Sequence, residues 1–301
     1  MNVIEAENLT YHYRRTNAVR GLNLTVPEGS VFALLGPNGA GKTTTIKMLM
    51  NLLRPDAGQA RVLGVSSTLL GPREFERIGY VSENQDLPLW MTVDRFADFG
   101  RALHPTWDRD LELKLRRQFD LPGRRPLEHL SRGMTMKAAL LAALSFRPKL
   151  LVLDEPFSGL DPLARDEFTR GLLEASTEGD WTILVSTHDI EEVERLCDWV
   201  GMIERGPMRI AESTESLLSR YRRVEAVNVP SFNNIVPDEW LDFERADGAV
   251  KFADRRYVAG QSETAYASAF GGAPVQVRPM TLREIFIAEA RSSRALGKEV
   301  K

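Results

Sequence analysis

Cysteine is almost absent from this chain of 301 residues, which contains only Cys197. No disulfide can form within the chain, which is typical of proteins in a reducing compartment. An excess of charge of one sign is also missing, because the formal net charge is -3 at pH 7. The chain therefore has no overall attraction to nucleic acid, and we expect no nucleic-acid partner.

Long apolar runs are missing as well. A helix that crosses a bilayer needs about 20 apolar residues. The longest candidate, residues 138–146, is ended by Arg147 and Pro148. Glu5 and Glu7 interrupt the N-terminal stretch, so we expect no signal peptide. If the protein works at a membrane, we expect another chain to supply the span.

Apolar runs of strand length alternate with helical patterns. Residues 2–35 are interpreted as short strands with turns. Continuous apolar runs predict three strands that are buried on both faces: residues 31–35, 150–153 and 182–186. Residues 78–82 are predicted to form a further strand. Helical patterns lie between them: residues 43–53, 93–121, 138–144 and 190–197. This alternation predicts an α/β fold with a largely parallel sheet.

The pattern changes after about Leu218. Residues 224–229 alternate like a strand, and a β-hairpin is predicted to turn at Asp247 and Gly248. Thr281 and Glu284 have the spacing of a capping box, so a last helix is predicted to begin there. We predict a first domain over residues 1–218, with a helical subdomain over about 87–148, and a small α+β domain over 219–301.

Residues 36–43 (GPNGAGKT) fit the phosphate-loop pattern, and a predicted strand precedes them while a helix follows. Glycines let successive backbone N–H groups point at a phosphate, and the helix N-terminus adds positive potential. In such loops the lysine, here Lys42, reaches the β- and γ-phosphates, and the hydroxyl of Thr43 ligates Mg²⁺. The loop therefore predicts a nucleotide site.

Polar side chains end two of the predicted strands. Asp154 follows the strand at residues 150–153, where an aspartate can hold Mg²⁺, and Glu155 next to it can polarise an attacking water. His188 follows the strand at residues 182–186. Ligands of open α/β sheets bind at such strand ends, so His188 is predicted to reach the γ-phosphate and orient the water.

In this order, the motifs resemble those of the nucleotide-binding subunit of an ABC (ATP-binding cassette) transporter. Residues 36–44 match the Walker A loop, 150–155 the Walker B strand and 158–161 the D-loop, and His188 matches the switch histidine. The resemblance covers residues 1–218 and implies a P-loop NTPase fold of the ABC type that hydrolyses ATP with Mg²⁺. It implies catalytic roles for Glu155, His188 and Lys42, and metal ligation by Thr43, Asp154 and Glu83. The residues expected to bind ATP are Tyr13, Gly36, Asn38, Gly39, Ala40, Gly41, Lys42, Thr43, Thr44, Glu83, Ser131, Gly133 and Asp161.

Tyr13 occupies the place of the family's aromatic residue that stacks on adenine. Two alternatives remain open from the sequence. Tyr13 could instead be a strand aromatic in the core, and Tyr11 could take the stacking role.

Residues 130–134 (LSRGM) stand where the family carries its signature, usually Leu-Ser-Gly-Gly-Gln. In the family this serine and the helix behind it contact the γ-phosphate of ATP on the opposite subunit. Ser131 is also a good N-cap, and with the N–H of Gly133 and the helix dipole it would form an anion site. One copy of each motif then implies a head-to-tail dimer with a second ATPase subunit, identical or homologous.

The chain departs from the family's motifs in two places. Arg132 and Met134 replace the usual glycine and glutamine of the signature, and Glu83 stands where the family has a glutamine. An oxygen donor such as Glu83 could still ligate Mg²⁺ and sense the γ-phosphate. Gln85, two residues on, is the alternative.

The resemblance also implies membrane partners. Residues 87–91, which include Trp90, are apolar and lie where the family receives a coupling helix from the membrane subunit; ordinary subdomain core is the alternative. The C-terminal part of the chain, which ends in the stretch at residues 279–286, resembles the small accessory domain of export-type subunits. We therefore expect an ATP hydrolase that powers export through separate integral membrane permease subunits, at the cytoplasmic face of the cell membrane. The alternative is a soluble ABC ATPase that drives a cytosolic assembly or regulatory step.

Overall fold

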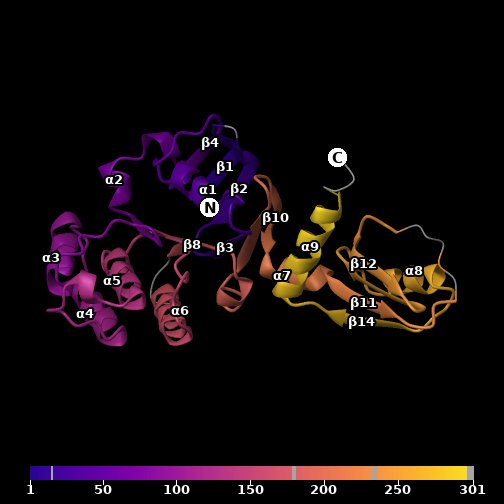
Figure 1. Cartoon of the computed structure of the whole chain (residues 1–301). Coiled ribbons are helices and arrows are strands. Elements are labelled where there is room, and N and C mark those ends of the chain that lie inside the picture. The colour runs from indigo at the N-terminus through magenta and orange to yellow at the C-terminus, as the bar shows by residue number, and fades with distance from the viewer. Residues whose placement is uncertain (15, 178–180, 231, 233–235, 297–301) are drawn as a thin grey trace. The chain divides into compact units, whose positions relative to one another are not determined.

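The computed structural model of the chain describes residues 1–14, 16–177, 181–230, 232 and 236–296 (Figure 1). It divides into two compact units, Met1–Ala211 and Glu212–Lys301. Helix α7 (Thr214–Arg220) therefore belongs to the second unit, although the sequence pattern changes only after Leu218. The residue that follows the helix explains this, because Tyr221, the C-cap of α7, is fully buried and donates a hydrogen bond to Glu289 of the same unit.

The first unit is built on a six-stranded sheet, as the alternating pattern predicts. In order along the sheet, the strands are β10 (Met208–Ser213), β9 (Trp199–Ile203), β3 (Val31–Leu35), β8 (Thr182–Thr187), β7 (Leu150–Asp154) and β6 (Ile78–Ser82). The strands from β9 to β6 pair in parallel. Every residue of β7 and β8 is buried, as expected of parallel strands covered on both faces.

A second, antiparallel sheet covers part of the same core. It has the order β2 (Thr16–Pro27), β1 (Asn2–Tyr13), β4 (Ala57–Val62) and β5 (Val65–Ser66). The prediction of short strands was wrong here, because β1 and β2 each run for 12 residues. Helix α1 (Lys42–Leu49) shares one apolar cluster with both sheets, in which Ile4, Phe32 and Ile46 are fully buried.

Helices make up most of the remaining first unit. They are α2 (Pro72–Phe75), α3 (Val93–Leu103), α4 (Arg109–Gln118), α5 (Arg132–Leu144) and α6 (Pro162–Thr177), with short 3-10 helices η1 (Ser67–Leu69), η2 (Leu127–His129) and η3 (Ile190–Glu192). Figure 1 shows α3, α4 and α5 gathered in one group. The predicted helical stretch 93–121 is divided near Pro105, which cannot donate a backbone hydrogen bond. In the described residues no helix has the length and hydropathy needed to cross a membrane.

Two predicted helices are shorter than expected. Helix α1 ends at Leu49 rather than at residue 53. The predicted helix at residues 190–197 was wrong, because only η3 forms there and turns follow it. Asp189 caps η3 by accepting a hydrogen bond from the N–H of Glu191 (3.0 Å).

The second unit combines a four-stranded antiparallel sheet with helices. The sheet order is β12 (Trp240–Ala246), β13 (Ala249–Asp254), β11 (Arg222–Ala226) and β14 (Val275–Pro279), and the helices besides α7 are α8 (Gln261–Ala269) and α9 (Leu282–Leu296). The predicted hairpin is confirmed, with φ of 49° at Asp247 and 76° at Gly248. The predicted capping box is confirmed by reciprocal hydrogen bonds between Thr281 and Glu284.

The parallel sheet supplies the first stability prediction. Leu184 is fully buried in β8, so truncation to alanine should leave a cavity between the sheet and α1 and lower the free energy of unfolding by about 2–5 kcal/mol. Urea unfolding followed by circular dichroism measures the change. Leu69→Ala is the control, because Leu69 is 73% exposed and its truncation should change the free energy by less than about 0.5 kcal/mol. Equal losses in both variants would contradict the burial argument.

Candidate nucleotide-binding site

The phosphate loop joins the end of β3 to the start of α1, and two of its glycines are sterically required. A Cβ at Gly36 would lie 2.4 Å from the carbonyl oxygen of Ile203. Gly41 has φ of 112°, and a Cβ there would lie 2.4 Å from the carbonyl oxygen of Ala18. Neither position accepts a side chain, so the loop can form its tight turn at the N-terminus of α1 only with glycine.

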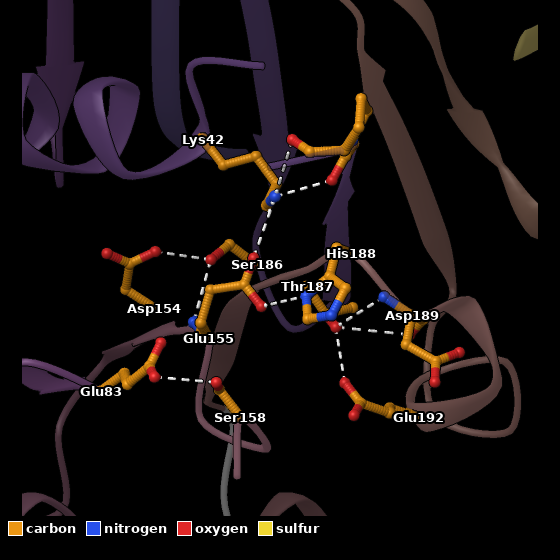
Figure 2. A network of polar contacts seen from close by, with 12 residues as sticks. Lys42, Glu83, Asp154, Glu155, Ser158, Ser186, Thr187, His188, Asp189 and Glu192 are labelled. Carbon is orange, nitrogen blue, oxygen red and sulfur yellow. Dashed lines mark hydrogen bonds and ion pairs between the residues drawn. The ribbon is translucent and has the colours of Figure 1, made fainter. Parts of the chain in front are cut away.

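Lys42 is held at the base of this loop with its side chain 5% exposed. Its Nζ donates hydrogen bonds to the carbonyl oxygens of Gly36 (2.6 Å) and Pro37 (3.3 Å). It also forms an ion pair with Oε1 of Glu155 at 2.9 Å (Figure 2). A buried ammonium group is stable only when it is paired in this way, and it offers a fixed positive charge to a phosphate.

Asp154 lies at the end of β7 and faces the loop. Its Oδ1 accepts hydrogen bonds from the hydroxyls of Ser186 (2.6 Å) and Thr43 (3.1 Å). Burial raises the pKa of Asp154, an effect that these two hydrogen bonds oppose. The hydroxyl of Thr43 and the carboxylate of Asp154 thus meet at one point, as the sequence predicted for a Mg²⁺ site.

Ser186 has a part in the site that sequence reasoning did not assign. Besides its bond to Asp154, its Oγ accepts a hydrogen bond from the N–H of Glu155 at 3.1 Å (Figure 2). One hydroxyl at the end of β8 therefore orients two consecutive residues at the end of β7. The available signal was a hydroxyl residue at the end of a buried strand, two residues before His188.

Glu155 carries a carboxylate that is shared between two partners. While Oε1 pairs with Lys42, Oε2 lies 2.9 Å from Nδ1 of His188 (Figure 2). The backbone of Glu155 has φ of 52°, which turns the chain sharply after β7. The loops after β3, β7 and β8 are thereby joined at one carboxylate, which is oriented from both sides and is suited to accept a proton from water.

Lys42, Thr43 and Glu155 border a pocket of about 470 Å³. It is lined by Tyr13, Thr16, Ala18, Asn38, Gly39, Ala40, Gly41, Lys42, Thr43, Thr44, Glu83 and Glu155. Ten of these were named from the sequence, whereas Thr16 and Ala18 were not. Thr16 lies on β2 directly opposite Tyr13, a pairing that no sequence motif revealed.

The open alternatives for Tyr13 and Glu83 differ in where the structure places them. Tyr13 lines the pocket and is 45% exposed, whereas Tyr11 packs against the core. The two rings meet edge to face, with 4.8 Å between their centroids. Glu83 lines the pocket, where its Oε1 accepts a hydrogen bond from Ser158 (2.8 Å). The Oε1 of Gln85 instead accepts one from the backbone N–H of Ser82 (3.0 Å).

Ser131, Gly133 and Asp161 lie outside the pocket lining in the part of the chain that the structure describes. Ser131 is the N-cap of α5 and accepts a hydrogen bond from the N–H of Met134 (3.2 Å). Asp161 caps α6 in the same way through the N–H of Ala164 (2.9 Å), and Gly133 packs close to Ala164. Within one chain these three residues organise helix N-termini rather than the pocket.

Comparison with known proteins agrees with this geometry. Residues 19–158 match the family model described as ABC transporter. The chain is 38% identical over 224 residues to the Nod factor export ATP-binding protein I of Burkholderia lata, which covers 71% of this chain and 72% of that protein. The chain belongs to the ABC transporter ATP-binding proteins.

Other comparisons support the same family. This ABC ATPase is 38% identical over 219 residues to the daunorubicin/doxorubicin resistance ATP-binding protein DrrA of Streptomyces peucetius, covering 70% of the chain and 65% of that protein. For other relatives the chain spans only 61% or 37% of their length. A solved ATP-binding subunit of an ABC transporter superposes with a TM-score of 0.64 at 26% identity, over 72% of this chain and 92% of that one.

The family and the geometry of the site together identify the pocket as a nucleotide-binding site. The chain is a member of the ABC transporter ATP-binding proteins, and its fold is the P-loop NTPase fold of the ABC type, as the sequence predicted. The phosphate loop, with its paired and buried lysine, is where the triphosphate of ATP fits.

The environment of Lys42 predicts the effect of its removal. Lys42→Ala should abolish measurable ATP binding, because the phosphate loop loses its only side-chain cation while Glu155 is left facing the phosphates. Binding of a fluorescent ATP analogue to the purified chain measures this. Lys47→Ala, which changes a lysine further along α1, is the matched control and should bind as the unaltered chain does. If the Lys42→Ala variant still bound ATP, the role of Lys42 in holding the phosphates would be refuted.

Proposed function

We propose that this ABC ATPase hydrolyses ATP at the interface of a head-to-tail dimer, at the cytoplasmic face of the cell membrane. The cycle would power export through separate integral membrane permease subunits. One observation carries the chemical part of the proposal: the carboxylate of Glu155 is held between Lys42 and His188 beside the phosphate loop.

In this proposal the pocket contacts both ends of the ATP molecule, the adenine and the phosphates. Tyr13 stacks on the adenine at the exposed rim, while the loop amides and Lys42 hold the phosphates. The hydroxyl of Thr43 and the carboxylate of Asp154 fit Mg²⁺, since both are oxygen donors and lie 3.1 Å apart; Glu83 adds a second carboxylate. When bound, Mg²⁺ neutralises charge on the phosphate oxygens.

The residues around Glu155 provide the hydrolytic step. Glu155 accepts the proton of the attacking water, and Lys42 stabilises the negative charge on the transferred phosphoryl group. His188 fixes the orientation of the Glu155 carboxylate through Nδ1 and reaches toward the γ-phosphate. Ser186 holds the backbone of Glu155 in place for this reaction.

The second half of the site would come from another ATPase subunit, identical or homologous. Ser131 is exposed at the N-terminus of α5, a position that favours an anion, yet it lies outside the pocket of its own chain. Ser131, Gly133 and Asp161 would therefore complete the ATP site of the partner. We assign residues 1–218 to the ATPase domain, with its helical subdomain over about 87–148, and residues 219–301 to an accessory domain.

A groove on the helical group supports a permease partner over a free cytosolic ATPase. It measures about 360 Å³ and is lined mainly by apolar and aromatic side chains, including Leu87, Phe99 and Leu103. The side chains of Phe99 and Leu103 are about half exposed. Trp90, three residues after Leu87 in the sequence, is exposed as well. Exposed apolar clusters of this kind mark protein interfaces. Export is favoured by the relatives named for export and for drug resistance.

The proposed base gives the main test of this function. Glu155→Gln should reduce ATP hydrolysis by at least about 100-fold, because an amide cannot accept the water's proton, while ATP binding persists. The trapped ATP should then hold two subunits together, which gel filtration with light scattering detects. Glu28→Gln, a change of an exposed carboxylate that does not line the pocket of the described chain, is the control. A monomeric variant with full activity would refute the role of Glu155.

The groove gives an independent test of the membrane partner. Phe99→Glu should prevent co-purification of the chain with its permease in detergent, because a charge would be buried in an apolar contact. ATP affinity should stay unchanged, since Phe99 does not line the nucleotide pocket of the described chain. Leu113→Glu, at a similarly exposed leucine on α4, is the control. Unchanged recovery of the permease with Phe99→Glu would place the docking surface elsewhere.

A further inference from the structure

The two places where the chain departs from the usual motifs meet in space. Arg132, which replaces a glycine of the signature, forms an ion pair with Glu83, which replaces the usual glutamine. The two residues are 49 positions apart in the sequence. The departures therefore form one interaction instead of two separate changes.

A third segment joins this contact. The same Oε1 atom of Glu83 that Arg132 approaches also accepts the hydrogen bond from Ser158. Gly159 next to it has φ of 69°, and a Cβ at this position would lie 2.8 Å from the Arg132 guanidinium. The side chain of Arg132 therefore lies against the loop after β7, in space that a glycine leaves free.

The pair connects the nucleotide pocket with the N-terminus of α5. Glu83 lines the pocket, and its backbone N–H is tied to the carbonyl oxygen of Asp154 (3.0 Å). Arg132 is the first residue of α5 and follows Ser131, the N-cap. Among the described residues that line the pocket, Arg132 does not appear. Its ion pair with Glu83 therefore connects Arg132 to a residue that lines the ATP pocket of its own chain.

We propose that Arg132 is a positioning residue that, through Glu83, sets the direction of the α5 N-terminus relative to the ATP pocket of the same chain. The inference rests on the proposed function, because Ser131 at that N-terminus is the residue that would face the partner's ATP. ATP that rearranges Glu83 in one pocket would thereby change how Ser131 is presented to the other subunit.

The exposure of the pair indicates an effect on orientation more than on stability. The side chains of Arg132 and Glu83 are 49% and 26% exposed, and ion pairs this accessible to water contribute little to folding. An interaction of this size still changes a local opening equilibrium by about two- to five-fold. That range is measurable by hydrogen exchange.

The first test uses the free chain without nucleotide. Arg132→Gln and Glu83→Gln should each raise the rate of amide hydrogen exchange about two- to five-fold in two segments, residues 83–91 and residues 127–135. The double variant Arg132→Glu with Glu83→Arg should restore slow exchange, because it re-forms the pair with the charges reversed. Arg170→Gln is the control, since it breaks a surface ion pair with Asp166 on α6, whose two side chains are 65% and 63% exposed, and should leave both segments unchanged. Unchanged exchange in the single variants, or no recovery in the double variant, would overturn the proposal.

The second test separates positioning from direct contact with ATP. In a Glu155→Gln background, Arg132→Gln should raise the ATP concentration needed for dimer formation about two- to five-fold, and Arg132→Lys should restore part of the loss. The affinity of the single chain for ATP should not change. An equal loss of affinity in the single chain would make Arg132 a direct ligand and overturn the positioning role. If Glu155→Gln alone never dimerises with ATP, the proposed function fails, whereas the exchange experiment still decides the role of the pair.

Discussion

The contact on which the site depends is the sharing of one carboxylate, that of Glu155, between Lys42 and His188. Glu155 and His188 directly follow β7 and β8, and Lys42 is the first residue of α1, which the phosphate loop joins to β3. Because β3, β8 and β7 are neighbours in one parallel sheet, their carboxyl ends lie at the same edge. The parallel order of buried strands is therefore what allows residues more than 100 positions apart to form one polar cluster beside the phosphate loop.

Burial determines how this cluster behaves electrostatically. The side chain of Lys42 and the carboxylate of Asp154 are nearly inaccessible to water, and an isolated charge there would be strongly destabilising. Each is compensated locally, Lys42 by two carbonyl oxygens and Glu155, and Asp154 by the hydroxyls of Ser186 and Thr43. Groups already held by such contacts need little reorganisation when a phosphate arrives, which is the condition for electrostatic stabilisation of a transition state.

The sequence predicted the elements whose cause is local. The residue pattern located β3 and β6 to the residue, and the capping signal of Ser131 located the start of α5. Local pattern failed at residues 190–197, where helical spacing is present but η3 gives way to turns. It also could not reveal contacts of Ser186 or the pairing of Arg132 with Glu83, because these depend on loop conformations and on strand order rather than on spacing along the chain.

The N-terminus of α5 does not line the pocket of its own chain in the described residues. The ion pair between Arg132 and Glu83 matters because it links these two separate parts. A single chain contains both a phosphate loop and an exposed, serine-capped helix N-terminus, but α5 does not supply its N-terminus to that loop's pocket in the described structure. Two chains arranged head to tail would use both. In such an arrangement, a contact inside each chain would let the occupancy of its own pocket affect the helix that it offers to the other chain. The backbone N–H of Glu83 donates a hydrogen bond to Asp154 and its carboxylate pairs with Arg132, so Glu83 provides a polar path from the pocket to the N-terminus of α5.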